Sequence, residues 1–146
     1  MTQLNLHQAN RIIEAALGKA RELDLPPMSV AVLDAGGHLQ ALQREDGQSF
    51  LRVRVSQAKA WGALALGTNS RNIAERCEQG TRQEGFIGAL NAMTGGGLMP
   101  LPGGVLIKDP AGRTLGAVGV AGAVSEEDEL CARAGITAAG FDAGGS

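Results

Sequence analysis

The spacing of apolar residues first predicts an amphipathic helix near the start of the chain. Between residues 6 and 23 the apolar positions recur with a 3.6-residue period. Asn5, followed three residues later by Gln8, has the pattern of a capping box at the helix start. The pair Pro26-Pro27 follows, and because the residue before a proline is biased away from helical backbone, the helix is expected to end before it.

Two hairpins are predicted from shorter apolar runs. The first joins residues 28–34 to residues 38–44 through a glycine turn, and the second turns at Asp109–Gly112, where proline presets the backbone. The last strand carries small residues at almost every other step between Gly116 and Gly122. Glycine weakens a strand, so we expect a close backbone, a partner or a ligand to need that space.

The remaining segments are predicted to be mainly helical. One helix spans about residues 50–66 and ends at Gly67, and Ser70 is placed as the cap of a short helix. Residues 79–98 are compatible with a short helix or an irregular segment. Ser125 and Asp128 predict a capping box for a final helix. Because two hairpins cannot build a purely parallel sheet, we predict one α+β domain over residues 1–146, with an antiparallel sheet flanked by helices.

Composition excludes several classes of protein. The 146 residues carry a formal net charge of −2, which argues against a nucleic-acid surface. There is no run of about 18 apolar residues and no apolar signal-peptide core near the start, so we expect a cytoplasmic protein that does not enter a membrane. Cys77 and Cys131 lack metal-type spacing and are interpreted as thiols, with a disulfide or a catalytic thiol as alternatives.

Six segments spread along the chain carry recognisable motifs. They are V-A-V-L-D-A-G-G-H-L (30–39), R-E-D-G (44–47), A-K-A (58–60), P-G-G-V-L-I (102–107), G-A-V-G-V-A-G (116–122) and S-E-E-D-E-L-C-A-R-A-G (125–135). Together these motifs resemble the GlcG/HbpS-like family, also called the haem-degrading or DUF336 family. They occur in the family's order and cover nearly the whole chain. Three residues, Glu45, Leu106 and Ala121, depart from the family's usual pattern.

The resemblance implies a profilin-like three-layer arrangement around a central antiparallel sheet of about five strands. It also implies a homo-oligomer. Members of the family are described as haem-binding proteins, as partners in redox sensing and as domains beside cobalamin enzymes, so the family indicates the fold more closely than the function.

A ligand pocket is predicted from charged residues beside glycine-rich turns. A lysine, an arginine and a carboxylate can hold an anion or move a proton, and successive backbone N–H groups can bind an anion. Each group also has an ordinary structural interpretation: a solvated lysine, a surface turn or a helix-start acid. The candidate ligand-binding residues are Arg44, Asp46, Gly47, Lys59, Pro102, Gly103, Gly104 and Asp128.

Haem would need an axial ligand, for which His38 and His7 are the candidates, although either is also interpretable as a surface histidine. The methionines at 28, 93 and 99 are weaker candidates that typically fill cores. The chain has no C-x-x-C-H motif for covalent haem and no metal-ligand spacing. Gly116-x-x-Gly119-x-x-Gly122 lies inside a strand pattern, so it does not predict dinucleotide binding.

We therefore expect a protein that binds haem or another small carboxylated or aromatic molecule as a homo-oligomer. The alternative is a cofactor-independent lyase, isomerase or hydrolase acting on a small organic acid. In that case Lys59 or Asp46 would transfer the proton and Arg44 would hold the carboxylate. A third hypothesis is a structural or partner protein whose assembly is its function.

Overall fold

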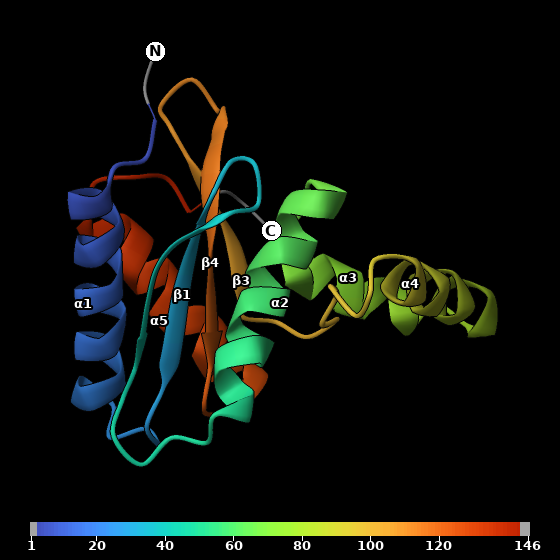
Figure 1. Cartoon of the computed structure of the whole chain (residues 1–146), viewed down its shortest axis with the longest axis horizontal. Coiled ribbons are helices and arrows are strands. Elements are labelled where there is room, and N and C mark those ends of the chain that lie inside the picture. Colours follow the sequence, from blue (N-terminus) through green and yellow to red (C-terminus); the bar gives the residue numbers. More distant parts are fainter. Residues whose placement is uncertain (1–2, 144–146) are drawn as a thin grey trace.

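Two antiparallel hairpins join into one four-stranded sheet with the strand order β2-β1-β4-β3. The computed structural model describes residues 3–143 (Figure 1). Strands β1 and β4 lie at the centre, where Val30 pairs with Val120 and Val32 with Val118. The elements are α1 (Leu6–Glu22), β1 (Ser29–Asp34), β2 (Leu39–Arg44), α2 (Leu51–Leu66), α3 (Ser70–Cys77), α4 (Thr81–Met93), β3 (Gly104–Lys108), β4 (Thr114–Ala121) and α5 (Ser125–Ala138).

The predicted three-layer arrangement is confirmed. Helices α1 and α5 pack together on one face of the sheet, and α2 covers the other (Figure 1). Because side chains alternate along a strand, Val118 and Val120 enter the core beneath α1 and α5, whereas Ala117 contacts the cluster beneath α2. The sheet has four strands rather than about five. The segment predicted as helical or irregular forms α4, and beyond the strands only an isolated bridge, from Lys108 to Asp142, extends the described sheet.

The glycine-rich strand β4 permits an unusually close approach of α2. A Cβ added at Gly119 would overlap the backbone oxygen of Ser56, and one added at Gly104 on β3 would overlap that of Lys59. Even the smallest side chain would therefore push helix and sheet apart. Of the three explanations expected from the sequence, a close backbone within the same chain accounts for these glycines.

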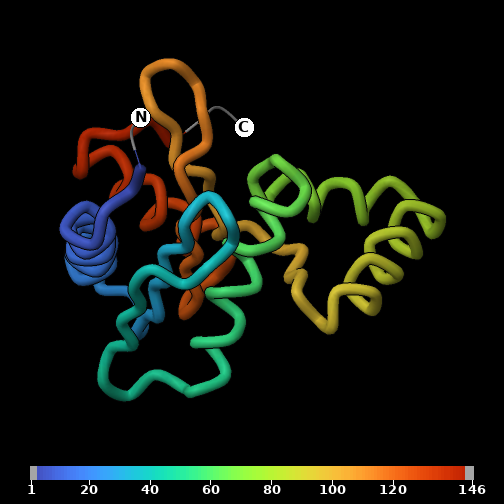
Figure 2. Tube along the Cα trace, turned by 45° about the horizontal axis from the view of Figure 1, so that its top comes forward, coloured from blue at the N-terminus to red at the C-terminus, as the bar shows by residue number. Residues whose placement is uncertain are grey.

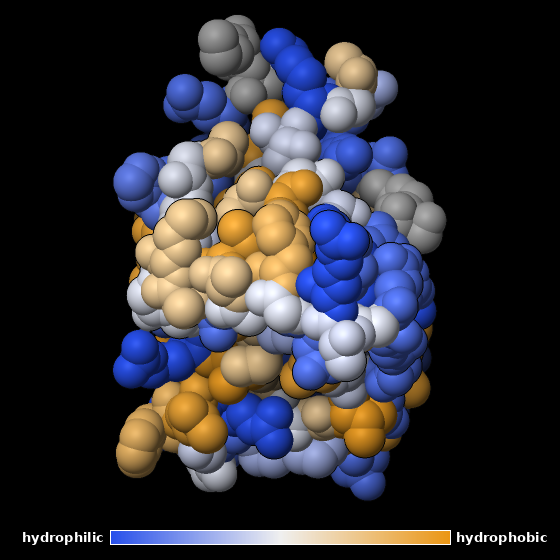
Figure 3. All heavy atoms as spheres, turned by 90° about the vertical axis from the view of Figure 1, so that its right-hand side faces the viewer, coloured by the Kyte–Doolittle hydropathy of each residue, from blue (hydrophilic) through white to orange (hydrophobic). Residues whose placement is uncertain are grey.

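Helices α3 and α4 form an arm that projects from the sheet (Figures 1 and 2). Ile73, Ile87 and Leu98 make a small buried cluster at its base. Phe86 on α4 is 46% exposed and Met93 is 75% exposed. An apolar patch bordered by polar groups is visible on this side of the molecule (Figure 3).

The caps at the helix ends agree only in part with those predicted from the sequence. The capping box of Asn5 and Gln8 is confirmed, and Gly67 ends α2 in the left-handed conformation, with φ of 69°. The caps predicted at Ser70 and Ser125 are wrong, because both residues lie inside the first helical turn and the caps are Asn69 and Val124. In the described part of the chain, no helix combines the length and apolar character needed to cross a bilayer.

Candidate functional site

The structure brings Lys59 and Asp128 together in the interior. Lys59 lies on α2 and Asp128 in the first turn of α5, and their side chains form an ion pair of 3.0 Å at 1% exposure each. Lys59 Nζ also donates to the backbone oxygen of Val120 at 3.0 Å. Asp128 accepts the N–H of Ala123 at 2.9 Å, so it binds the chain that enters α5.

Burial dominates the electrostatics of this pair. Desolvation lowers the pKa of Lys59, and the attraction of Asp128 opposes that change. Desolvation likewise raises the pKa of Asp128, against the attraction of Lys59 and the hydrogen bond from Ala123. The geometry favours a positioning role, in which the pair holds α2, β4 and α5 in one register.

The Pro102–Gly104 loop lies against Lys59, but its backbone forms hydrogen bonds within the protein. A Cβ at Gly103 would lie 2.9 Å from Lys59 Nζ. The N–H of Gly104 donates to Ser70 Oγ at 2.8 Å, and that hydroxyl donates to the oxygen of Leu101 at 2.6 Å. The N–H of Gly104 is therefore bound internally, and the hydroxyl of Ser70, expected to cap a helix, holds this loop instead.

The Arg44–Gly47 loop lies elsewhere, at a surface hollow of about 410 Å³ lined by Arg21, Pro27, Arg44, Glu45 and Asp46. Arg44 donates to the backbone oxygen of Gln48 at 2.7 Å. Glu45, which departs from the family pattern, accepts the N–H of Met28 at 2.8 Å and pairs with Arg21 at 3.2 Å. The predicted pocket residues thus fall into an interior group around Lys59 and a surface group around Asp46.

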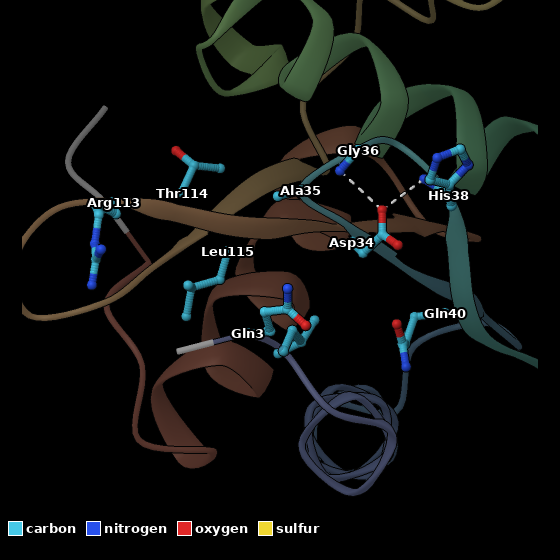
Figure 4. A pocket seen from close by; sticks show the side chains of 10 residues that line it. Gln3, Asp34, Ala35, Gly36, His38, Gln40, Arg113, Thr114 and Leu115 are labelled. Carbon is cyan, nitrogen blue, oxygen red and sulfur yellow. Dashed lines mark hydrogen bonds between the residues drawn. The ribbon is translucent and has the colours of Figure 1, made fainter. Parts of the chain in front are cut away.

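A further cavity of about 370 Å³ lies between the β1–β2 turn and the start of β4 (Figure 4). Its buried apolar floor includes Leu4 and Leu115, and its rim includes His38 and Arg113. We call it the His38 cavity; it is lined by Gln3, Leu4, Asp34, Ala35, Gly36, His38, Gln40, Arg113, Thr114 and Leu115.

Asp34 shapes the turn that carries His38. Its Oδ1 accepts the N–H of Gly36 at 2.9 Å and that of His38 at 3.0 Å (Figure 4). The His38 ring packs over the turn, since a Cβ at Gly36 would lie 3.0 Å from its Cδ2. No residue in the described part of the chain hydrogen-bonds to the ring nitrogens. Arg113 lies across the cavity from His38 in Figure 4 and pairs with Asp109 at 3.1 Å.

Sequence reasoning placed His38 among the candidates but missed Arg113 and Leu115. Both follow the predicted Asp109–Gly112 turn, and antiparallel pairing of β1 with β4 brings them beside the first hairpin. The missing information was the pairing between the two hairpins. His7 is exposed on α1 outside the lining of this cavity, whereas Met28 is fully buried.

Over residues 3–143, no group of three or more histidine, cysteine or acidic side chains is arranged to hold a metal ion. Cys77 and Cys131 are free thiols. Burial raises the pKa of the Cys131 thiol to about 11, so it is not poised as a nucleophile.

Known proteins resemble this chain along most of its length. An uncharacterised 15.0 kDa protein of Citrobacter freundii, from the dhaT-dhaS intergenic region, is 28% identical over 133 residues, which are 91% of this chain and 89% of that protein. The corrinoid adenosyltransferase PduO of Salmonella typhimurium is 25% identical over 138 residues. That match covers 92% of this chain but 38% of PduO, so this chain corresponds to one part of that enzyme.

The fold also occurs in solved structures. The crystal structure of the PduOC:haem complex has a TM-score of 0.86 and 23% identity, over 99% of this chain and 100% of that one. The model of the family described as "Haem degrading protein HbpS-like" matches residues 4–137. The chain belongs to this HbpS-like family of haem-degrading proteins.

Proposed function

We propose that this chain binds haem in the His38 cavity. The observation that carries the proposal is the placement of His38 and Arg113 on opposite sides of one cavity with an apolar floor (Figure 4). A haem site needs an axial ligand for the iron, apolar contact for the ring and cations for the propionates. The family and the haem held by the structurally similar PduOC support this choice of ligand.

The residues present fit each of these needs. The exposed His38 ring has nitrogens free of hydrogen bonds from the described residues and can bind iron. Leu4 and Leu115 offer apolar contact, and Arg113, 64% exposed, has N–H groups beyond the one that binds Asp109. Several lining residues are exposed, so a haem held here would keep one edge in water. Bound haem would supply an iron centre capable of redox chemistry or of binding a further small ligand.

Haem titration of the purified apoprotein tests the proposal. We expect a saturating shift of the Soret band at one haem per chain. The shift should be lost or strongly changed in His38→Ala and retained in His7→Ala, the matched control from the exposed part of α1. Absence of a saturating shift, or identical spectra for wild type and His38→Ala, overturns this assignment.

The surface loop predicted from the sequence is a second location, for a small carboxylate rather than haem, because its lining within residues 3–143 holds Arg44 but no histidine, cysteine, methionine or tyrosine to bind haem iron. Asp46 and Arg44 line the same hollow and both are exposed. If a small carboxylate binds at this loop, Arg44→Met will weaken its binding and His38→Ala will not. For the enzyme hypothesis, Lys59 is 1% exposed and lines neither this hollow nor the His38 cavity, so Asp46 is the remaining candidate for proton transfer.

We also propose that the chain forms a homo-oligomer through the α3–α4 arm. Phe86 and Met93 on α4 are exposed apolar residues. An apolar patch is also visible on this side of the molecule (Figure 3), and exposed apolar patches typically mark contact sites. Light scattering coupled to gel filtration should give a mass above one chain. Phe86→Glu combined with Met93→Glu should reduce the mass to that of the monomer, and a monomeric wild type contradicts the proposal.

A further inference from the structure

We propose a second ligand site, on the other side of the β1–β2 turn, that binds a small aromatic carboxylate. It is a cavity of about 380 Å³ between this turn, α2 and the Thr94–Gly97 loop. We call it the Trp61 cavity, and its lining includes Leu39, Arg54, Trp61 and Gly97. It is distinct from the His38 cavity because the two share no lining residue: Gly37 and Leu39 line this cavity, whereas Gly36 and His38 line the other.

Trp61 supplies an aromatic surface that is fixed in place. A Cβ at Gly37 would lie 3.2 Å from its Nε1, and one at Gly97 would lie 2.9 Å from its Cζ3. Two glycines therefore border opposite edges of the indole without side chains that would cover it. Trp61 is half-buried and packs against the core beneath α2, so the ring is held before a ligand arrives.

Glycine at these two positions also suits a flat ligand. Gly37 has φ of 83°, which disfavours other residues, while Gly97 is limited by contact with Trp61 rather than by its backbone. Leu39, which is 52% exposed, adds an apolar contact at the rim. Ligand pockets are lined mainly by apolar and aromatic side chains, and Leu39 and Trp61 supply one of each here.

Two hydrogen-bond donors in the cavity indicate a negatively charged ligand. Arg54 is exposed, lines the cavity and has no ion-pair partner among residues 3–143. The Nε1–H of Trp61 likewise has no acceptor within the described residues. No aspartate or glutamate lines the cavity, so its charge is positive. A carboxylate is the group that an arginine and an indole N–H would bind together, because both only donate.

The single tryptophan of the chain makes the site directly observable, since intrinsic fluorescence reports on Trp61 alone. The probe is 4-nitrobenzoate, whose ring quenches indole emission on contact. We expect saturable quenching, whereas free N-acetyltryptophanamide should show only linear collisional quenching. The neutral analogue 4-nitrobenzyl alcohol should bind about tenfold more weakly, because it lacks the charge that Arg54 recognises.

Three variants show whether 4-nitrobenzoate binds in the Trp61 cavity. Arg54→Met should raise the Kd for 4-nitrobenzoate about tenfold, while Arg82→Met, an exposed arginine on α4 outside the lining, should leave it unchanged. His38→Ala should also leave it unchanged, so failure of this site and failure of the haem proposal are read separately. Linear quenching in the wild type, or equal Kd values for wild type and Arg54→Met, overturns the inference.

Discussion

Lys59 Nζ and Asp128 Oδ2 lie 3.0 Å apart, with both side chains withdrawn from water to 1% exposure. The residues are far apart in the sequence and come from helices on opposite faces of the sheet. Removing one partner would leave the other charge buried and unpaired. An unpaired buried charge destabilises the folded protein by more than the intact pair stabilises it.

Lys59→Met is therefore expected to lower the free energy of unfolding by about 3–5 kcal/mol, measured by urea denaturation. The double variant Lys59→Met/Asp128→Leu should lose less, because no unpaired charge remains. Lys19→Met is the matched control, since its pair with Glu22 at 3.5 Å is partly exposed, and it should cost less than about 1 kcal/mol. Equal losses for Lys59→Met and Lys19→Met would contradict the positioning role.

The close approach of α2 to β4 gives a second prediction. Gly119→Ala should destabilise the protein by about 1–3 kcal/mol or more, since its Cβ would overlap the backbone of Ser56. Gly18→Ala lies within α1 with nothing within 4 Å of the added Cβ, so it should stabilise by about 0.5–1 kcal/mol. Thermal unfolding of both variants checks the opposite signs, and a neutral Gly119→Ala would argue against the tight packing.

Features that depend on neighbouring residues were predictable from the sequence, whereas contacts between distant elements were not. Asn5 and Gln8 are three residues apart, so their capping box was predictable, as was the left-handed Gly67. The partners of Lys59 depend on how α2 and α5 pack on the sheet, and the spacing of residues along the sequence does not reveal that packing. Arg113 lies at the His38 cavity because β4 pairs with β1, and this pairing could not be predicted from the sequence.

Cys131 gives a pH-dependent prediction. Its thiol is fully buried, and burial raises its pKa to about 11 from 9.0. Between pH 9 and 11 the unfolded thiol loses its proton while the folded one keeps it, so the unfolded state binds fewer protons. Stability from this group is therefore complete below pH 9 and falls as the pH rises, by up to about 1.4 kcal/mol per pH unit.

The measurement is urea denaturation at several pH values for wild type and Cys131→Ala. The difference in their free energies of unfolding should shrink from pH 9 to 11, because the variant lacks this titration. At pH 8 we also expect a thiol reagent to modify the half-buried Cys77 in the native protein, and both cysteines in urea. Rapid native modification of Cys131 would contradict its burial.

Two serines at helix starts give the last prediction. Both were expected to act as caps, yet Ser70 Oγ accepts the buried N–H of Gly104 at 2.8 Å, whereas Ser125 makes no side-chain hydrogen bond within the described residues. Ser70→Ala leaves that N–H and the oxygen of Leu101 without this partner and should cost about 1–3 kcal/mol. Ser125→Ala should change stability by less than about 0.5 kcal/mol. If urea denaturation shows the reverse order, Ser125 is the cap that its sequence pattern predicts, and the hydroxyl of Ser70 does not hold the Pro102–Gly104 loop.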